Sequence, residues 1–264
     1  AAAPVAVLGN SQYFWWIFMI VLFLISYGLI SAELGTSFES EGGLYDWVRK
    51  AHGRKMGTRV SWYYWINFPL WMASLAVIFP EMLQMITGIK IGVMPALIIE
   101  LAFIWIVVML SFYPVSDSVW ILNGAAIIKV LLALIVGGLG IYVAITHGVA
   151  NPMTPKSFLP SFDIASLGVI SVIIFNCLGL EVITNFASDM ENPKKQIPQA
   201  IISGGLAIAI VYIFTAFGIG TAIPTKDISS SAGLVDSVEL LLAKITSSPV
   251  TWFVTLVAIL FLLT

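Results

Sequence analysis

Long apolar runs alternate with short polar segments along the whole chain of 264 residues. A helix needs about 20 apolar residues to cross a bilayer, because each residue adds about 1.5 Å to its length. Six runs reach that length, and a seventh starts near Val250 and stops at Thr264. The six predicted spans are residues 13–32, 60–87, 91–113, 119–145, 164–188 and 199–222. The pattern therefore predicts an all-α polytopic membrane protein.

The fifth predicted span differs from the others because polar residues and a glycine interrupt it. Its apolar run ends at Phe175, the segment Asn176–Gly179 follows, and Glu181 comes six residues after Phe175. A broken helix leaves backbone N–H and C=O groups that lipid cannot satisfy, so it is tolerated where it lines a cavity or meets a ligand. A carboxylate at membrane depth indicates a functional site. The alternative is a glycine packing notch beside a snorkelling Glu.

The basic residues predict which side of the membrane each polar segment faces. Of the twelve Lys and Arg, five lie in residues 49–59 and two in residues 189–198, and Lys129 is predicted to be buried in the fourth span. The remaining four are spread over longer segments on the other side, residues 1–12, 88–90, 146–163 and 223–249. Positive residues stay inside, so residues 49–59 are predicted to be cytoplasmic.

This orientation places the first residues of the chain outside the cell. We therefore expect a preceding helix whose outer end is Ala1–Gly9, and a chain that is the interior of a longer permease. Two polar segments also show the apolar spacing of helices that lie on a surface. Their apolar positions are Leu44, Trp47, Val48 and Ala51 in the first, and Leu234, Val238, Leu241 and Leu242 in the second.

Composition supports a membrane protein and excludes several other classes. Hydrophobic residues make up 59% of the chain and charged residues 10%, against about 25% charged in soluble domains. The net charge of −2 argues against a nucleic-acid partner. The single cysteine, Cys177, excludes an internal disulfide and is predicted to be a small packing residue. His52 and His147 are predicted to lie in loops without a ligand cluster, so we expect no metal, no cofactor and no enzyme site.

Three stretches, taken in this order, resemble the amino acid–polyamine–organocation (APC) transporters, and most of all their glutamate/γ-aminobutyrate antiporter branch. The first is Ser31–Leu34 with Glu41–Val48, which reads Glu-Gly-Gly-Leu-Tyr-Asp-Trp-Val. The second is Gly179–Glu181 with Glu191–Ala200, which reads Glu-Asn-Pro-Lys-Lys-Gln-Ile-Pro-Gln-Ala. The third is Ser231–Leu234, and together the stretches span the chain from end to end.

The resemblance implies the LeuT-type fold, in which two inverted repeats each contribute a broken helix to the substrate site. Residues 1–264 would form a single, incomplete transmembrane domain that covers transmembrane helices 2–7 and part of 8. Helix 1 and its glycine-rich break would be absent. The substrate-binding residues that the resemblance implies are Phe175, Asn176, Cys177, Leu178, Gly179, Trp71 and Ser74.

In such a site the carbonyls of residues 175–178 would receive the ammonium of an amino acid, and a half-helix N-terminus would receive its carboxylate. Phe175 is placed like the aromatic gate of the family, and the alternative is a lipid-facing Phe. Trp71 and Ser74 share a helix face where family members line the substrate. The alternative for this pair is a packed Trp and a helix-capping Ser.

Two ionisable residues are predicted to couple transport to protons. Glu181 would be costly as an unpaired charge, and burial favours the neutral form of a carboxyl group, so protonation could bias the break between two arrangements. The alternative is a structural hydrogen bond between helices. Lys129 lies about 16 Å into its span, where the resemblance implies that a Lys replaces the sodium ion of other relatives. The alternative is a snorkelling Lys.

Together these features predict secondary active transport of amino acids across the inner membrane of a bacterial cell, by exchange or linked to protons. The expected partners are the amino-acid substrate, the lipid bilayer, protons and the missing transmembrane helices. A non-transporting, permease-like sensor or subunit is the alternative. A channel is disfavoured because the sequence shows no selectivity filter or ring of charges.

Overall fold

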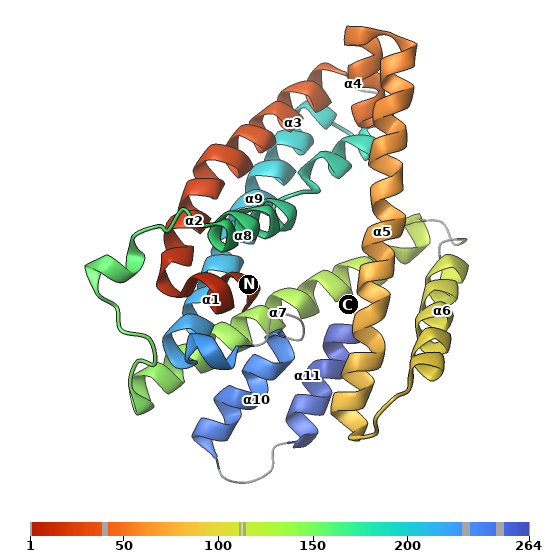
Figure 1. The fold of residues 1–264 in the computed structure, drawn as a ribbon. Coiled ribbons are helices and arrows are strands. Elements are labelled where there is room, and N and C mark those ends of the chain that lie inside the picture. The colour runs from red at the N-terminus through yellow and green to blue at the C-terminus, as the bar shows by residue number, and fades with distance from the viewer. Residues whose placement is uncertain are drawn as a thin grey trace. The chain divides into compact units, whose positions relative to one another are not determined.

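The computed structural model describes residues 2–38, 42–110, 112, 115–228, 233–246 and 251–263 (Figure 1). All regular elements in these ranges are helices. Six of the helices are long and apolar enough to cross a membrane, which confirms the six predicted spans. Four predicted features fall outside the described residues: the end of the third span at Tyr113, Glu41 of the first motif, Ser231-Ala232 of the third motif, and the two ends of the seventh run at Val250 and Thr264.

The first span is longer and less regular than its apolar run predicts. It consists of α1 (Ala2–Leu8), the 3₁₀ turn η1 (Gly9–Ser11), α2 (Gln12–Met19), the π-helix η2 (Ile20–Ile25) and α3 (Ser26–Ser37). A π-helix is rare and is frequently found at functional sites. The apolar pattern could not predict it, because six consecutive apolar residues fit either helix type.

The other spans keep their predicted order with shifted ends. They are α5 (Arg54–Thr87), α6 (Val93–Leu110), α7 (Val115–His147), α8 (Ile164–Asn176) with the 3₁₀ helix η4 (Leu180–Asp189), and α9 (Pro193–Ala222). The predictions for α5 and α9 began at the hydrocarbon edge, whereas both helices extend into polar sequence. His52 and His147 were predicted to lie in loops, but each is the last residue of a helix.

The chain forms two compact units, which we describe separately. Unit 1 comprises residues 1–9, 69–152 and 214–264. In it α7 packs against α10 (Gly233–Ile245) and α11 (Thr251–Leu263) (Figure 1). Val136 and Val143 of α7 and Val238 and Leu241 of α10 are fully buried in this core. The apolar face predicted for the segment after Ala222 is thus confirmed at Val238 and Leu241.

Segments of unit 1 that the charge pattern places outside the cell lie together. Helix α1 packs against α10 and against η5 (Thr225–Asp227). The Asn151 side-chain amide donates to the carbonyls of Gly220 and Ile223 at 2.7 and 2.8 Å. These bonds satisfy carbonyls at the end of α9 that a helix leaves without partners. The grouping agrees with the predicted orientation, because all these segments belong to the set with few basic residues.

Unit 2 comprises residues 10–68 and 153–213 and contains the interrupted helix. Its first span packs against α8 through α2 and against η4 through α3, while α4 (Gly43–His52) packs against η4. The short helix predicted from the spacing of Leu44, Trp47, Val48 and Ala51 is therefore present, although Ala51 is exposed. Trp16 is fully buried and stacks on Tyr212 of α9 with 5.4 Å between ring centroids.

Candidate substrate site

The break predicted in the fifth span is confirmed. Helix α8 ends at Asn176, η4 begins at Leu180, and Gly179 between them has a φ of 108° and a ψ of −4°. Positive φ costs glycine little and strains other residues. A Cβ atom built on Gly179 would have no atom within 4 Å. The glycine is therefore required by the backbone turn and not by the space around it.

Part of the backbone in the break is already hydrogen-bonded. The Cys177 N–H donates to the carbonyl of Ile174 at 2.9 Å, and the Leu178 N–H donates to the carbonyl of Phe175 at 3.3 Å. The Asn176 side-chain amide donates to the carbonyl of Val172 at 2.7 Å, which turns this side chain back onto α8. The Cys177 N–H is also directed at the Phe175 carbonyl, so the backbone of the break itself engages this carbonyl.

The carboxylate of Glu181 is folded back over the break and accepts two hydrogen bonds. The hydroxyl of Tyr64 donates to Oε1 at 2.7 Å, and the N–H of Gly179 donates to Oε2 at 3.1 Å. The same N–H also approaches the hydroxyl oxygen of Tyr27 at 3.3 Å. Glu181 was predicted to be costly as an unpaired charge, and the structure pairs it with two donors. The interhelical hydrogen bond that was the alternative is present, and the proton-coupling role stays a prediction.

Two tyrosines reach the break: Tyr64 of α5 bonds the Glu181 carboxylate, and the hydroxyl of Tyr27 of the first span accepts from the Gly179 N–H. Tyr27 stacks on Phe23 with 5.5 Å between centroids, and Tyr64 meets Phe68 edge to face at 5.1 Å. Phe175, the predicted gate, is 47% exposed. Such rings can hold a cation over their faces. The site therefore combines a half-buried carboxylate with aromatic faces, an arrangement suited to a positively charged ligand.

Sequence reasoning missed Tyr27 and Tyr64, although a signal for both was available. Each tyrosine lies within an apolar span, and its hydroxyl needs a hydrogen-bond partner when it is removed from water. A tyrosine inside a span is thus a candidate partner for a carboxylate at the same depth. Which tyrosine meets Glu181 depends on how the helices pack, and the sequence pattern does not give this.

The side chain of Cys177 points into the protein core. It is 1% exposed and packs with Leu24 of the π-helix and Ala209 of α9. This confirms that Cys177 is a small packing residue. It also shows that only the backbone of Cys177 is available to a ligand.

Leu180, the first residue of η4, anchors the second half of the broken helix. Its Cδ1 lies 3.6 and 3.7 Å from the positions that Cβ atoms would take on Gly28 and Gly205. An apolar cavity of about 380 Å³ adjoins it, between α3 and α9. Gly28, Ala32, Ile201 and Gly205 are among its lining residues. Because the lining offers no polar side chain, the cavity does not suit a charged substrate.

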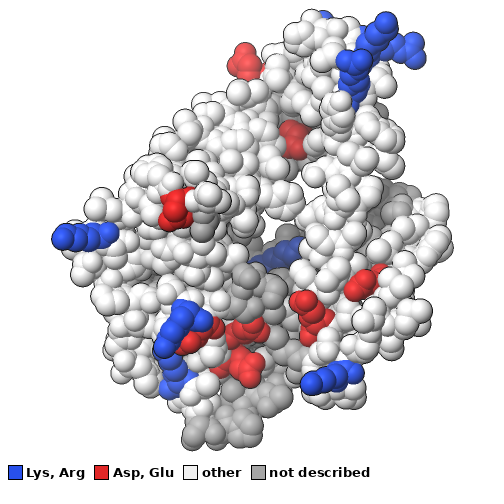
Figure 2. All heavy atoms as spheres, in the orientation of Figure 1, with Lys and Arg blue, Asp and Glu red and all other residues white. Residues whose placement is uncertain are grey.

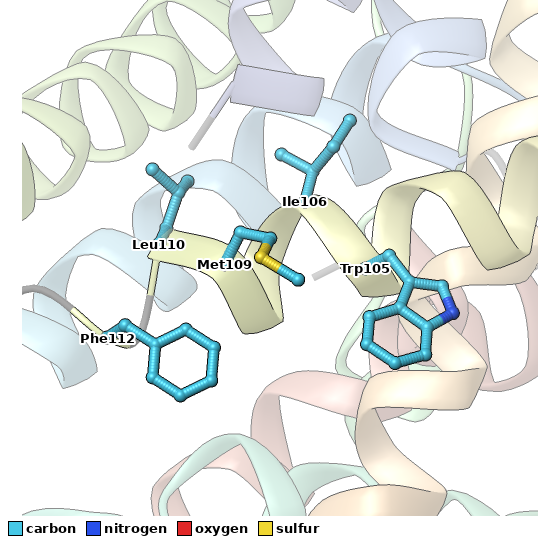
Figure 3. A pocket seen from close by; sticks show the side chains of 5 residues that line it. All are labelled: Trp105, Ile106, Met109, Leu110 and Phe112. Carbon is cyan, nitrogen blue, oxygen red and sulfur yellow. The ribbon is translucent and has the colours of Figure 1, made fainter.

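A second cavity, of about 610 Å³, lies in unit 1 along α6 (Figure 3). Its lining side chains come from α6 and the turn that follows: Trp105, Ile106, Met109, Leu110 and Phe112. The indole N–H and the thioether are their only heteroatoms. No α6 residue is buried within the described chain, so this apolar surface is typical of a helix in contact with lipid or other helices.

Trp71, Ser74 and Lys129 belong to unit 1, whereas the break belongs to unit 2. Trp71 is 41% exposed, and the Ser74 hydroxyl donates to the Trp71 carbonyl of its own helix at 2.6 Å. Lys129 was predicted to be buried, but it is exposed. It lies one turn before Leu132, where the buried stripe of α7 begins. Roles for these three residues in substrate or ion binding stay predictions.

A discontinuous membrane helix is typical of secondary transporters. With its six described helices long and apolar enough to cross a membrane, the chain has the features of a multi-pass membrane protein. Comparison with protein families agrees, because the model described as "Amino acid permease" matches residues 1–264. The chain belongs to this family, within the APC superfamily.

Individual proteins are also similar to this chain, to different degrees. The chain is 61% identical over 264 residues, its full length, to the probable agmatine/putrescine antiporter AguD of Lactococcus lactis. It is 26% identical to an uncharacterized transporter of Legionella pneumophila over 98% of its length. It is 22% identical to the glutamate/γ-aminobutyrate antiporter of Lactococcus lactis over 84% of its length. The chain covers 56%, 56% and 46% of these relatives, or about half of each.

Proposed function

We propose that the full protein is an antiporter that exchanges the cationic amines agmatine and putrescine across the inner membrane. The observation that supports this most strongly is the 61% identity, over all 264 residues, to a probable agmatine/putrescine antiporter. Identity to the glutamate/γ-aminobutyrate antiporter is only 22%. A cationic amine is therefore a better candidate substrate than the amino acids to which the sequence motifs pointed.

The chemistry of the break supports a cationic substrate. Agmatine carries a guanidinium and an ammonium at neutral pH, putrescine carries two ammonium groups, and neither has a carboxylate. Such ligands need negative charge, carbonyl oxygens and aromatic faces. Glu181 supplies the charge, and each of its oxygens has a lone pair beyond the bonds from Tyr64 and Gly179. Phe175, with its half-exposed ring, supplies an aromatic face.

Equal charges on the two amines make one-for-one exchange electrically neutral. The full protein, purified and reconstituted into liposomes loaded with putrescine, should take up radiolabelled agmatine. Empty liposomes should show little uptake, and a potassium–valinomycin potential should not change the initial rate. Excess external putrescine should compete, whereas glutamate and γ-aminobutyrate should not.

Two results would overturn the proposal. Exchange of glutamate for γ-aminobutyrate without agmatine uptake would show that the protein transports these amino acids and not the amines. Binding of agmatine with no exchange of any of the four compounds would favour the permease-like sensor or subunit.

A further inference from the structure

The helical hairpin formed by α4 and the start of α5 carries a concentrated positive charge. Residues 49–59 contain five Lys and Arg and no acidic residue, and all five side chains are exposed. Figure 2 shows blue side chains gathered around α4 and the first turns of α5. These cations are Arg49, Lys50, Arg54, Lys55 and Arg59.

The hairpin is a defined structure. Gly53, with a φ of 81°, ends α4, and α5 starts at the next residue. A Cβ atom on Gly57 would lie 3.0 Å from Cβ of Arg49 and 3.1 Å from the ring of Tyr45. This close packing of α4 on α5 holds the cations of both helices on one small surface.

Two of the five basic side chains already interact with neighbouring residues. Arg49 pairs with Asp46 at 2.9 Å, and the Lys50 ammonium lies 4.3 Å from the centroid of the Phe38 ring. Arg54, Lys55 and Arg59 form no ion pair with any residue that the structure describes. These three are therefore the charges available to a ligand.

The arrangement of these three charges is unfavourable without an anion. Lys55 and Arg59 are four residues apart on one helix, where like charges repel. Arg54 and Lys55 occupy the first turn of α5, where the helix dipole is itself positive and where no acidic residue lies. An anion on this surface would relieve both repulsions.

The position of the hairpin indicates which anion it meets. Its basic residues place it on the cytoplasmic side by the positive-inside rule, directly where α5 leaves the bilayer. The inner leaflet presents anionic headgroups there, and clusters of Lys and Arg next to a span bind them. We propose that Arg54, Lys55 and Arg59 form a docking surface for the phosphate groups of anionic phospholipids.

This surface is connected to the broken helix. Helix α4 packs against η4, and a Cβ atom on Gly43 would collide with the side-chain oxygen of Asn185. Lipid bound at the hairpin would therefore hold an element that touches the second half of the broken helix. The binding surface itself does not depend on which substrate is transported.

The test uses the full protein in phosphatidylcholine nanodiscs that contain fluorescent phosphatidylglycerol in increasing fraction. A Cys177→Ala, Met56→Cys protein carries an acceptor dye at the exposed position 56, within the cluster. Energy transfer should saturate at a lower fraction for phosphatidylglycerol than for labelled phosphatidylcholine. Arg54→Gln, Lys55→Gln and Arg59→Gln together should raise the half-saturation fraction by on the order of tenfold or more, because each cation near an anionic surface contributes about a fivefold preference.

The matched control removes three exposed lysines from segments predicted to be external, as Lys90→Gln, Lys156→Gln and Lys226→Gln. This variant should keep the wild-type half-saturation, and 0.5 M salt should weaken the wild-type preference. Equal transfer from both lipids would overturn the proposal. So would an unchanged preference in the Arg54/Lys55/Arg59 variant, or an equal loss in the control. Thermal unfolding of each variant shows whether it remains folded.

Discussion

Glu181 is the residue on which the chemistry of the break depends. Its carboxylate accepts hydrogen bonds from Tyr64 on α5 and from the Gly179 backbone. Two donors stabilise a negative charge that the apolar span would otherwise make costly. Each carboxylate oxygen keeps a lone pair beyond these bonds that can accept from a cationic ligand.

Glu181→Gln should weaken agmatine binding by about 10- to 100-fold, because a hydrogen bond to a charged group contributes about 1.5–3 kcal/mol. Binding of labelled agmatine to the purified full protein and to the variant measures this loss, and wild-type affinity in the variant would assign Glu181 a structural role.

Tyr64→Phe should remove the hydrogen bond to Oε1 and keep the ring that meets Phe68. We expect a loss of about 1–2 kcal/mol in unfolding free energy and a smaller loss of agmatine affinity than in Glu181→Gln. Tyr63→Phe is the matched control, because Tyr63 is 67% exposed. Chemical denaturation of both variants in detergent compares them, and equal stabilities would count against the bond.

At the scale of elements, two irregular helices meet at the break. The π-helix η2 brings Leu24 against Cys177, and Leu180 fits between Gly28 of α3 and Gly205 of α9. π-helices and long 3₁₀ segments are uncommon and often mark hinges or functional sites. The break is thus held from both sides by packing, while its backbone turn rests on Gly179.

Gly179→Ala should destabilise the protein by about 1–2 kcal/mol, because a side chain at this positive φ strains the backbone. The matched control is Gly168→Ala in α8, where a Cβ atom also meets no atom within 4 Å but φ is helical. That change should leave stability equal or higher, since alanine favours a helix. Thermal unfolding of the two variants measures the difference. Equal losses of stability would contradict a requirement for positive φ at Gly179.

At the scale of the whole molecule, the sequence predicted most of what depends on local pattern. The six spans, the helix at Gly43–His52 and the break at Gly179 all follow from apolar runs and from a glycine beside polar residues. Helix ends were less accurate, because a helix such as α5 continues into polar sequence beyond the bilayer.

Features that depend on tertiary neighbours could not be predicted. The bond from Tyr64 to Glu181 joins residues 117 positions apart. Lys129 was expected to be buried because its span is apolar, yet among the α7 side chains that the structure describes the buried ones begin at Leu132. The apolar run at residues 20–25 fits a π-helix and an α-helix equally well.

The orientation of the chain can be tested at both faces. Arg54→Cys is predicted to be cytoplasmic and Lys156→Cys external, from the distribution of basic residues. In a background of the full protein from which Cys177 and any cysteine beyond these 264 residues have been removed, an impermeant maleimide added to intact cells should label position 156 and not position 54. In permeabilised cells both positions should be labelled. Labelling of position 54 in intact cells would contradict the predicted orientation.

The most direct test of our central claim, that the break binds a cationic amine, is protection of the break by substrate. Leu178 is 45% exposed within it. Leu178→Cys should therefore react with a maleimide in the full protein, in a background from which Cys177 and any cysteine beyond these 264 residues have been removed. Saturating agmatine or putrescine should slow this reaction severalfold, glutamate should not, and Met56→Cys should react at the same rate with or without amine. Protection by glutamate alone, or no protection by either amine, would contradict the account.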